Sequence, residues 1–221
     1  MLFENGDRIV FAGDSVTDVG SANPVGEGLG DNLGRGYVRI IENMLCSVYP
    51  ERYIRVTNSG ISGNTSRHLA ARWERDVVNL EPQWVSICIG INDVWRQFDA
   101  PAIRTWVDLP EYESNLRAML DAVKGKVKGV FLMSPYYMEP LKEDPMRRRM
   151  DEYTAVCRRL AGEYGAIFVD LQAMFDRYFA YRHSTFIAYD RVHPNLIGAT
   201  LIAREFLSAA GFDYNHIPEE I

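Results

Sequence analysis

Cysteine is scarce in this sequence, and its spacing does not indicate a metal or redox site. The three residues Cys46, Cys88 and Cys157 lie far apart, each among apolar neighbours. A disulfide framework needs an even number of cysteines, and zinc or redox sites bring two of them together in short spacings. We therefore expect three buried free thiols and no metal site.

A long hydrophobic run and a typical leader sequence are also missing. The longest nearly apolar run extends only from Trp84 to Ile91, whereas a membrane helix needs about 20 apolar residues. Glu4 and Asp7 place negative charge where a signal peptide carries positive charge followed by an apolar stretch. These features predict a soluble, cytoplasmic protein with no membrane partner.

An excess of basic residues is missing as well. The chain has 30 acidic and 24 basic residues, and its formal net charge is −6. Nucleic-acid binding requires a basic surface, and we expect most of the cluster Arg147-Arg148-Arg149 to lie on the solvated face of a helix. The sequence therefore predicts no nucleic-acid partner.

The chain of 221 residues, 47% of them hydrophobic, is long enough for one domain with a sizeable core. We predict a single domain over residues 1–221, because short apolar runs typical of strands alternate with longer helical patterns throughout. This alternation predicts a parallel sheet covered by helices on both faces. The central strand should bury Ile87, Cys88 and Ile89 on both sides. The predicted strands are residues 8–12, 53–58, 84–90, 129–133 and 166–169.

Three helices are marked by the residues at their ends. Pro110 begins one helix, Asp144 caps a second in front of a proline, and Pro194 begins the last, which ends before Gly211. The segments 13–35 and 91–109 are longer than plain connections, and loops of such length are usually functional. Among the aromatic residues, Tyr178, Phe179 and Tyr181 either form a surface for a homo-oligomer or pack beneath the last loop.

Gly13-Asp14-Ser15 directly follows the first predicted strand. In open α/β sheets, ligands bind at the carboxyl ends of the strands. A serine at this place is either a turn residue or a nucleophile, and a nucleophilic serine needs a base that a third group orients. Of the four histidines, His193 lies three residues after Asp190, close enough for that carboxylate to orient the ring. The alternative is that Asp190 and His193 only cap the last helix.

A serine nucleophile also needs donors for the oxyanion that forms during acyl transfer. The glycines of residues 58–65 follow the second strand, and Asn92 follows the third. Either feature alone is also typical of an ordinary turn. Because parallel strands deliver their carboxyl ends to one edge of the sheet, we expect Ser15, these donors and His193 to form one site.

In this order, Gly13-Asp14-Ser15, residues 58–65, residues 90–93 and residues 190–193 resemble the four blocks of the SGNH (GDSL-type) hydrolases. Residues 14–18 and 90–96 are most similar to bacterial GDSL-type acetylxylan esterases. The resemblance implies a three-layer α/β/α sandwich, with a flavodoxin-like five-stranded parallel sheet of order 2-1-3-4-5. It also implies esterase chemistry without a metal or an organic cofactor. Val16 stands where the family name has leucine.

The resemblance also implies a role for each site residue. Ser15 is the nucleophile, His193 is the general base and later the acid, and Asp190 orients His193. The oxyanion hole consists of the backbone N–H groups of Ser15 and Gly63 and the side chain of Asn92. Gly63 is preferred to Gly60 because family members align on the later glycine. From their residue types, Asp18, Trp95 and Arg96 are predicted to bind substrate, since an aromatic and a polar group together suit a sugar ring.

The predicted function is that of a serine carboxylic-ester hydrolase that removes acetyl groups from acetylated xylo-oligosaccharides through an acyl-enzyme. One alternative is a lysophospholipase or acyl-thioesterase of the same family. That activity needs a long apolar groove, which the polar and aromatic segment 92–106 does not indicate. The other alternative is a non-catalytic sugar-binding module that retains the fold.

Overall fold

The computed structural model describes residues 1–28, 30–99 and 101–218, and a twisted sheet lies at its centre. The strand order in this part of the chain is β2-β3-β1-β4-β5-β6. The five longer strands pair in parallel in the order β3-β1-β4-β5-β6, which confirms the predicted order 2-1-3-4-5. The strands are β1 (Arg8–Gly13), β2 (Gly26–Glu27), β3 (Arg55–Gly60), β4 (Trp84–Cys88), β5 (Gly129–Met133) and β6 (Ile167–Val169).

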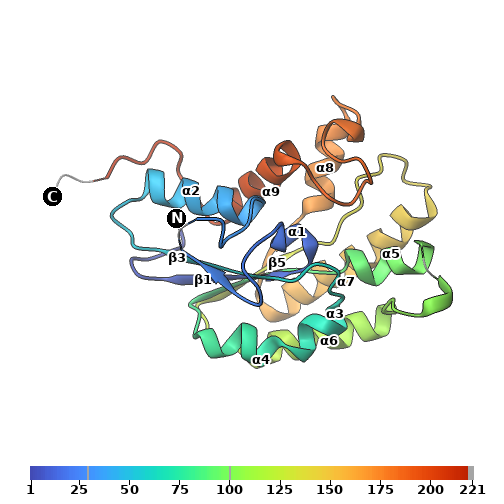
Figure 1. Cartoon of the computed structure of the whole chain (residues 1–221), viewed down its shortest axis with the longest axis horizontal. Coiled ribbons are helices and arrows are strands. Elements are labelled where there is room, and N and C mark those ends of the chain that lie inside the picture. Colours follow the sequence, from blue (N-terminus) through green and yellow to red (C-terminus); the bar gives the residue numbers. More distant parts are fainter. Residues whose placement is uncertain (29, 100, 219–221) are drawn as a thin grey trace.

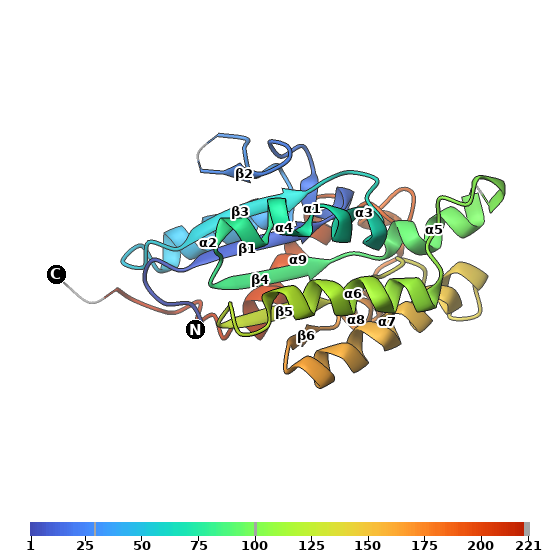
Figure 2. The same ribbon diagram turned by 90° about the horizontal axis from the view of Figure 1, so that it is seen from below.

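The short strand β2 was not predicted from the sequence. It pairs antiparallel with β3 at one edge of the sheet, and Figure 2 shows it apart from the helical layers. Two residues are too few to produce an alternating hydrophobic pattern, so the sequence holds no signal for this strand.

Helices cover both faces of the sheet (Figure 1). One face carries α2 (Tyr37–Val48), α8 (Leu171–Phe179) and α9 (Leu196–Ala209). The other carries α3 (Ser66–Ala71), α4 (Trp73–Asp76), α6 (Leu109–Val123) and α7 (Pro145–Tyr164). The short helix α1 (Ser15–Asp18) and the helix α5 (Ile91–Asp99) begin where β1 and β4 end. Three 3-10 turns complete the helical elements of the described residues, at Val78–Leu80, Pro101–Ile103 and Ser184–Phe186.

The central strands are apolar on both faces because each face meets a layer of helices. Phe11 and Phe131 pack toward α2 and α9, where both rings meet Phe206. Val10 and Ile87 of the same sheet belong to the hydrophobic cluster beneath α3, α6 and α7. Ile87, Cys88 and Ile89 are all buried, as predicted for a central strand.

The predicted helix ends are confirmed at α7 and corrected at α9. Asp144 caps α7 in front of Pro145, and its carboxylate accepts hydrogen bonds from the next free backbone amides. The last helix begins at Leu196 rather than at Pro194. The side chain of Asn195 accepts from the amides of Ile197 and Gly198 and therefore takes the capping position. Asp190 and His193 thus do not cap this helix.

The expectation of three buried thiols is wrong for one cysteine. Cys88 and Cys157 are buried, but Cys46 is exposed. Cys46 follows the buried Leu45 on α2, and one residue turns a helix by about 100°, which carries its side chain away from the core. All three thiols are free.

The aromatic residues that follow residue 177 lie partly against the core and partly at the surface. Tyr178 and Phe179 pack against the hydrophobic cluster that underlies α9, whereas the side chain of Tyr181 is 89% exposed. In the part of the chain that the structure describes, no helix combines the length and the hydropathy of a transmembrane segment.

Candidate active site

Ser15 lies at the carboxyl end of β1, as the first residue of α1. The turn is tight because Gly13 has no side chain: a Cβ there would lie 2.3 Å from Thr17 Oγ1 and 2.4 Å from the carbonyl oxygen of Cys88. Asp14 caps α1 by accepting a hydrogen bond from the Val16 N–H at 3.0 Å. Asp14 is therefore a structural residue of the turn. Burial raises the pKa of its carboxyl to about 7, against the opposing effect of that hydrogen bond.

A chain of hydrogen bonds connects Ser15 with His193 and Asp190. The Oγ of Ser15 lies 2.8 Å from Nε2 of His193, and Nδ1 of His193 lies 2.6 Å from Oδ2 of Asp190. Both distances are within hydrogen-bonding range, as a nucleophilic serine, its base and a carboxylate that orients the base require. The side chains of His193 and Asp190 are 44% and 40% exposed, so the three groups lie on an open surface.

The loop Asp190–His193 is held by contacts of its own backbone. The second carboxylate oxygen of Asp190 accepts from the amides of Val192 and His193, at 3.0 and 2.8 Å. Arg191, which directly follows Asp190, adopts a φ of 63°, in the left-handed region that costs energy for a residue with a side chain. Its carbonyl accepts from the amide of Met138, and its guanidinium pairs with Glu139 at 2.6 Å. These contacts fix the orientation of His193.

The hydrogen bonds of this loop also determine the charge of Asp190. Partial burial alone would raise the pKa of its carboxyl, but the hydrogen bonds from His193 and from the two amides have the larger combined effect. The pKa of Asp190 is therefore below its usual value. An ionised carboxylate beside His193 stabilises the positive charge that the ring acquires when it takes a proton.

Gly60 and Gly63, the two glycines considered for the oxyanion hole in residues 58–65, differ in whether their backbone amides already donate a hydrogen bond. The N–H of Gly60 donates to Oδ1 of Asn58 at 2.9 Å, within the end of β3. Gly63 has a φ of 81°, and its Cα faces open space. Within residues 1–28, 30–99 and 101–218, the amides of Ser15 and Gly63 donate no backbone hydrogen bond. The geometry therefore favours Gly63 as the donor to a ligand.

Asn92 lies in the first turn of α5, buried beside the loop that contains Gly63. Its Nδ2 donates to the carbonyl oxygen of Asn64 at 3.0 Å. Its Oδ1 faces the guanidinium of Arg96, one turn later, at 3.4 Å. These contacts orient the amide, and its second N–H has no acceptor among residues 1–28, 30–99 and 101–218, so it can donate to a ligand.

The three residues predicted to bind substrate occupy different environments. The half-buried Trp95 meets the ring of His193 edge to face, with 5.8 Å between centroids. The guanidinium of Arg96 lies over the Trp95 ring at 4.6 Å and pairs with Asp99. Asp18 is buried, and its carboxylate accepts from the amides and hydroxyls of Ser21 and Ser62. Trp95 thus adjoins the triad, whereas Asp18 lies beneath the Gly63 loop.

Two buried residues that were not predicted from the sequence connect neighbouring elements at this end of the sheet. Arg72 donates to the carbonyl oxygens of Gly13 and Ser59 at 3.1 and 2.8 Å, which ties the ends of β1 and β3. Asp93 accepts from the amide and hydroxyl of Ser66, which ties α5 to the start of α3. Burial raises the pKa of Asp93 to about 7, and the bonds from Ser66 oppose this rise. Neither contact could be predicted from the sequence, because Arg72 belongs to no motif and Asp93 is only a second acidic residue within one.

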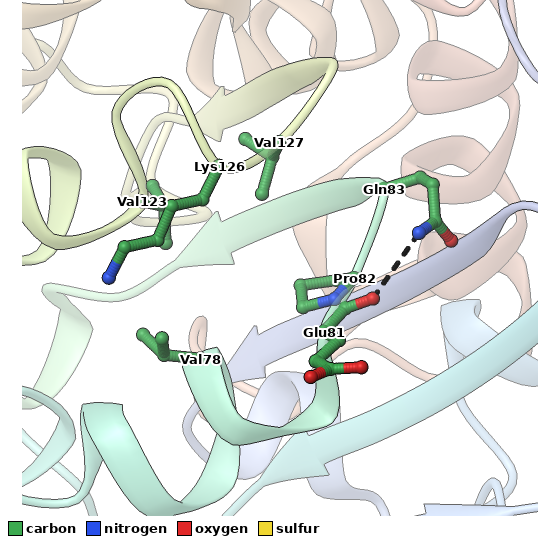
Figure 3. Close-up of a pocket in the computed structure, with 7 residues that line it drawn as sticks. All are labelled: Val78, Glu81, Pro82, Gln83, Val123, Lys126 and Val127. Carbon is green, nitrogen blue, oxygen red and sulfur yellow. Dashed lines mark hydrogen bonds between the residues drawn. The ribbon is translucent and has the colours of Figure 1, made fainter.

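A separate cavity of about 200 Å³ lies at the other end of the sheet, where β4 and β5 begin (Figure 3). Val78, Val123 and Val127 form its apolar walls, and Glu81 and Lys126 stand beside them. It adjoins none of the predicted site residues. Across the described residues, no group of three or more histidine, cysteine or acidic side chains is arranged to hold a metal ion.

Comparison with known proteins agrees with this geometry. The sequence profile of the GDSL-like Lipase/Acylhydrolase family matches residues 11–201. The chain is 48% identical to an acetylxylan esterase of Geobacillus stearothermophilus over 97% of its own length and 98% of that enzyme. The crystal structure of this esterase, Axe2, superposes with a TM-score of 0.95 over the same shares of the two chains.

Two further solved structures are similar. A variant of Axe2 described as a catalytic mutant, again 48% identical, has the same TM-score of 0.95 and covers 97% of this chain and 98% of its own. LAE5, described as an alpha/beta hydrolase from the metagenome of Lake Arreo in Spain, is 46% identical with a TM-score of 0.93. It covers 96% of this chain and 98% of its own.

Proposed function

This chain belongs to the GDSL-like lipase/acylhydrolase family, and on that premise we propose that it removes acetyl groups from acetylated xylo-oligosaccharides. The observation that carries the proposal is the hydrogen-bonded series Ser15–His193–Asp190 at 2.8 and 2.6 Å. The near full-length similarity to an acetylxylan esterase supports the substrate class. We propose one catalytic domain over residues 1–221, because the family profile extends from residue 11 to residue 201.

The proposed reaction has two steps. Ser15 Oγ attacks the carbonyl carbon of the acetyl ester while Nε2 of His193 takes the hydroxyl proton. The tetrahedral intermediate then collapses, the bond to the sugar oxygen breaks, and His193 returns the proton to the departing sugar. Water attacks the acetyl-serine in the same manner, which releases acetate and restores Ser15. Asp190 stabilises the positive charge on His193 in both steps.

We assign the oxyanion hole to the backbone N–H groups of Ser15 and Gly63 and the free N–H of Asn92. The Gly60 amide is already used within β3, so Gly63 is the better choice in the second block. Arg96 supports this assignment indirectly, because its contact with Oδ1 of Asn92 orients the amide. Fixed donors stabilise the developing charge without rearrangement during the reaction.

For Asp18, the geometry favours a positioning role over the predicted contact with substrate. Its two carboxylate oxygens accept four hydrogen bonds, two from Ser21 and two from Ser62. Ser62 directly precedes Gly63, so Asp18 holds the proposed oxyanion donor against α1. Trp95 keeps its assignment as a substrate contact because its ring adjoins His193.

A lysophospholipase or thioesterase is the second candidate within the family. Such enzymes bury a long acyl chain, and charged side chains disfavour that burial. Here the surroundings of the triad include Arg96, Asp99 and Arg191, and the triad itself is open to solvent. A series of 4-nitrophenyl esters tests the point: activity highest for the acetyl ester supports a deacetylase, whereas activity that rises toward long acyl chains supports the second candidate.

The direct test is acetate release from acetylated xylo-oligosaccharides by the wild-type protein and by Ser15→Ala. We expect release by the wild type and a loss of several orders of magnitude in the variant. Ser15-dependent cleavage of 4-nitrophenyl acetate without release from the sugar would retain the mechanism and reject the substrate. Activity that persists in Ser15→Ala would reject the nucleophile. Binding of xylo-oligosaccharides with no hydrolysis of either ester would support a sugar-binding module.

The remaining predictions concern location and partners. A cytoplasmic location and the absence of nucleic-acid and membrane partners stay predictions that rest on composition. Formation of a homo-oligomer also stays a prediction. Of the aromatic residues on which it was based, Tyr181 is the one that is well exposed.

A further inference from the structure

A pocket of about 290 Å³ lies directly beside the proposed triad. It is bounded by the end of α5, the start of α7 and the Asp190–His193 loop, and its lining includes Trp95, Tyr137 and Arg191. Trp95 also contacts the ring of His193, and Arg191 lies between Asp190 and His193 in sequence. The pocket is therefore adjacent to the proposed base, which must deliver a proton to the departing sugar oxygen.

Aromatic side chains provide the apolar part of this pocket. Trp95, Phe98 and Tyr137 all line it, and the ring of Phe98 is 45% exposed although it is large and apolar. Arg96 covers the Trp95 ring at 4.6 Å, and Arg191 covers the Tyr137 ring at 5.1 Å, so both rings are held in place. Tyr137 is only 4% exposed, so the apolar area open to a ligand belongs to Trp95 and Phe98, and the fixed Trp95 ring offers it at low entropic cost.

The pocket also contains polar atoms that have no hydrogen-bond partner among the described residues. In the described residues, neither the Tyr137 hydroxyl nor the Trp95 indole N–H forms a hydrogen bond, and neither is among the buried unsatisfied atoms. Neither atom is therefore fully buried, although Tyr137 as a whole is buried. Asp144 caps α7 through Oδ1, which accepts from the amides of Met146 and Arg147, and its Oδ2 accepts no hydrogen bond from the described residues. A donor, a hydroxyl and a carboxylate oxygen are thus available to a ligand.

The pocket is lined by both aromatic and charged side chains, and this combination restricts the class of ligand that it can bind. A long acyl chain would leave Asp144 and Arg191 in an apolar environment, which is costly. A sugar has apolar ring faces and hydroxyl groups around its edge, so it satisfies both kinds of lining. The cavity lies at the small end of the size range of ligand pockets, which suits about one sugar unit rather than a stretch of polymer.

We propose that this pocket binds a sugar unit of the acetylated xylo-oligosaccharide and so determines the selectivity of the enzyme for carbohydrate esters. The sugar ring packs against Trp95 and Phe98, and its hydroxyl groups bind the Tyr137 hydroxyl and Oδ2 of Asp144. This inference rests on the proposed function, because it assigns a subsite to the same substrate. It adds Phe98, Tyr137 and Asp144, which the motifs did not indicate.

The test is the selectivity ratio, defined as kcat/KM on acetylated xylo-oligosaccharide divided by kcat/KM on 4-nitrophenyl acetate. Tyr137→Phe removes one hydroxyl and keeps the ring, and Phe98→Ala removes an exposed ring. We expect the double variant to lower the ratio about tenfold, mainly through a higher KM for the sugar, because each lost contact weakens binding by a few-fold. Tyr53→Ala, which removes an exposed ring ahead of β3 at the other end of the sheet, should leave the ratio unchanged.

Each other outcome has a distinct meaning. An unchanged ratio in the double variant, with acetate still released from the sugar by the wild type, would overturn the subsite and leave the proposed function intact. A loss of similar size on both esters would also overturn it, since the variant would then have damaged the triad rather than sugar binding. A wild-type protein that cleaves only the aryl ester would remove the proposed substrate and the subsite with it.

Discussion

At the scale of single residues, the chemistry depends on how neighbours orient Asn92 and His193. Asn64 accepts from one side of the Asn92 amide, and Arg96 donates to the other. Asp190 uses one oxygen for His193 Nδ1 and the other for two backbone amides. In both cases a polar side chain has a single stable orientation, because its alternatives would leave donors or acceptors unpaired.

Replacing Asn92 by alanine tests the oxyanion hole. We expect Asn92→Ala to lower kcat on 4-nitrophenyl acetate about 10²–10³-fold, since one oxyanion donor contributes roughly 2.7–4 kcal/mol in such sites. KM should change little, because the donor acts mainly on charge that develops in the transition state. Steady-state kinetics of the purified variant provide the measurement, and an unchanged kcat would exclude Asn92 from the site.

Replacing Asp190 by asparagine tests the orientation of His193. Asparagine retains the size of the side chain but removes the negative charge that holds the imidazole in the useful tautomer. We expect kcat for Asp190→Asn to fall by about 10⁴, as such a change does in a serine protease. The thermal midpoint of the variant serves as the control for folding. A loss below tenfold in a folded variant would contradict the assigned role.

At the scale of elements, the site depends on contacts between loops from different strands. Arg72 joins the ends of β1 and β3, and Asp18 joins α1 to the loop after β3 through Ser62. The amide of Gly63 follows Ser62 directly, so its position relative to Ser15 depends on these contacts. The two amide donors of the proposed oxyanion hole thus come from separate elements that buried polar side chains hold together.

The variant Asp18→Ala distinguishes positioning from substrate binding. If Asp18 positions the Gly63 amide, kcat should fall about 10–100-fold on 4-nitrophenyl acetate and on the sugar ester alike, because a small displacement of a donor is costly. If Asp18 contacts the sugar instead, KM for the sugar ester should rise and kinetics on the aryl ester should be unaffected. Parallel kinetics on the two esters decide between these outcomes.

At the scale of the whole molecule, two buried carboxyls beside the site link stability to pH. Burial raises the pKa of both Asp14 and Asp93 to about 7, and the charge of Asp93 contributes to the rise for Asp14. Between the ordinary pKa of 3.8 and about 7, the folded protein therefore holds protons that the unfolded chain releases. The contribution of these groups to the free energy of unfolding falls as pH rises through that range and is constant above it.

Asp14→Asn removes one of these groups while keeping the acceptor for the Val16 amide. The free energy of unfolding of the variant relative to the wild type should therefore increase with pH between about 4 and 7, by at most about 1.4 kcal/mol per pH unit. Urea denaturation at several pH values measures this difference, with Asp31→Asn, an exposed acid, as the matched control. A difference that is independent of pH in this range would show that Asp14 is ionised in the folded protein.

Local patterns predicted a parallel sheet with helices on both faces, and the resemblance to the SGNH hydrolases supplied the order of its strands. Strands β1, β4 and β5 are short apolar runs, and parallel connection of such runs through helices permits few topologies. Two predictions from local patterns were wrong in detail. The start of α9 is set by the cap Asn195 rather than by Pro194. Cys46 faces solvent because α2 buries the side of the helix that carries Leu45.

What the sequence determined by itself is the fold, the family and the order of the candidate groups along the chain. These follow from periodicity and from motifs that each lie within a few consecutive residues. The tertiary structure alone showed the burial of Asp18 under the Gly63 loop, the different use of the Gly60 and Gly63 amides, and the pocket that Tyr137 and Asp144 share with Trp95. Those features arise between segments that are distant in sequence, and only the packing of side chains across elements brings their atoms within hydrogen-bonding or van der Waals distance.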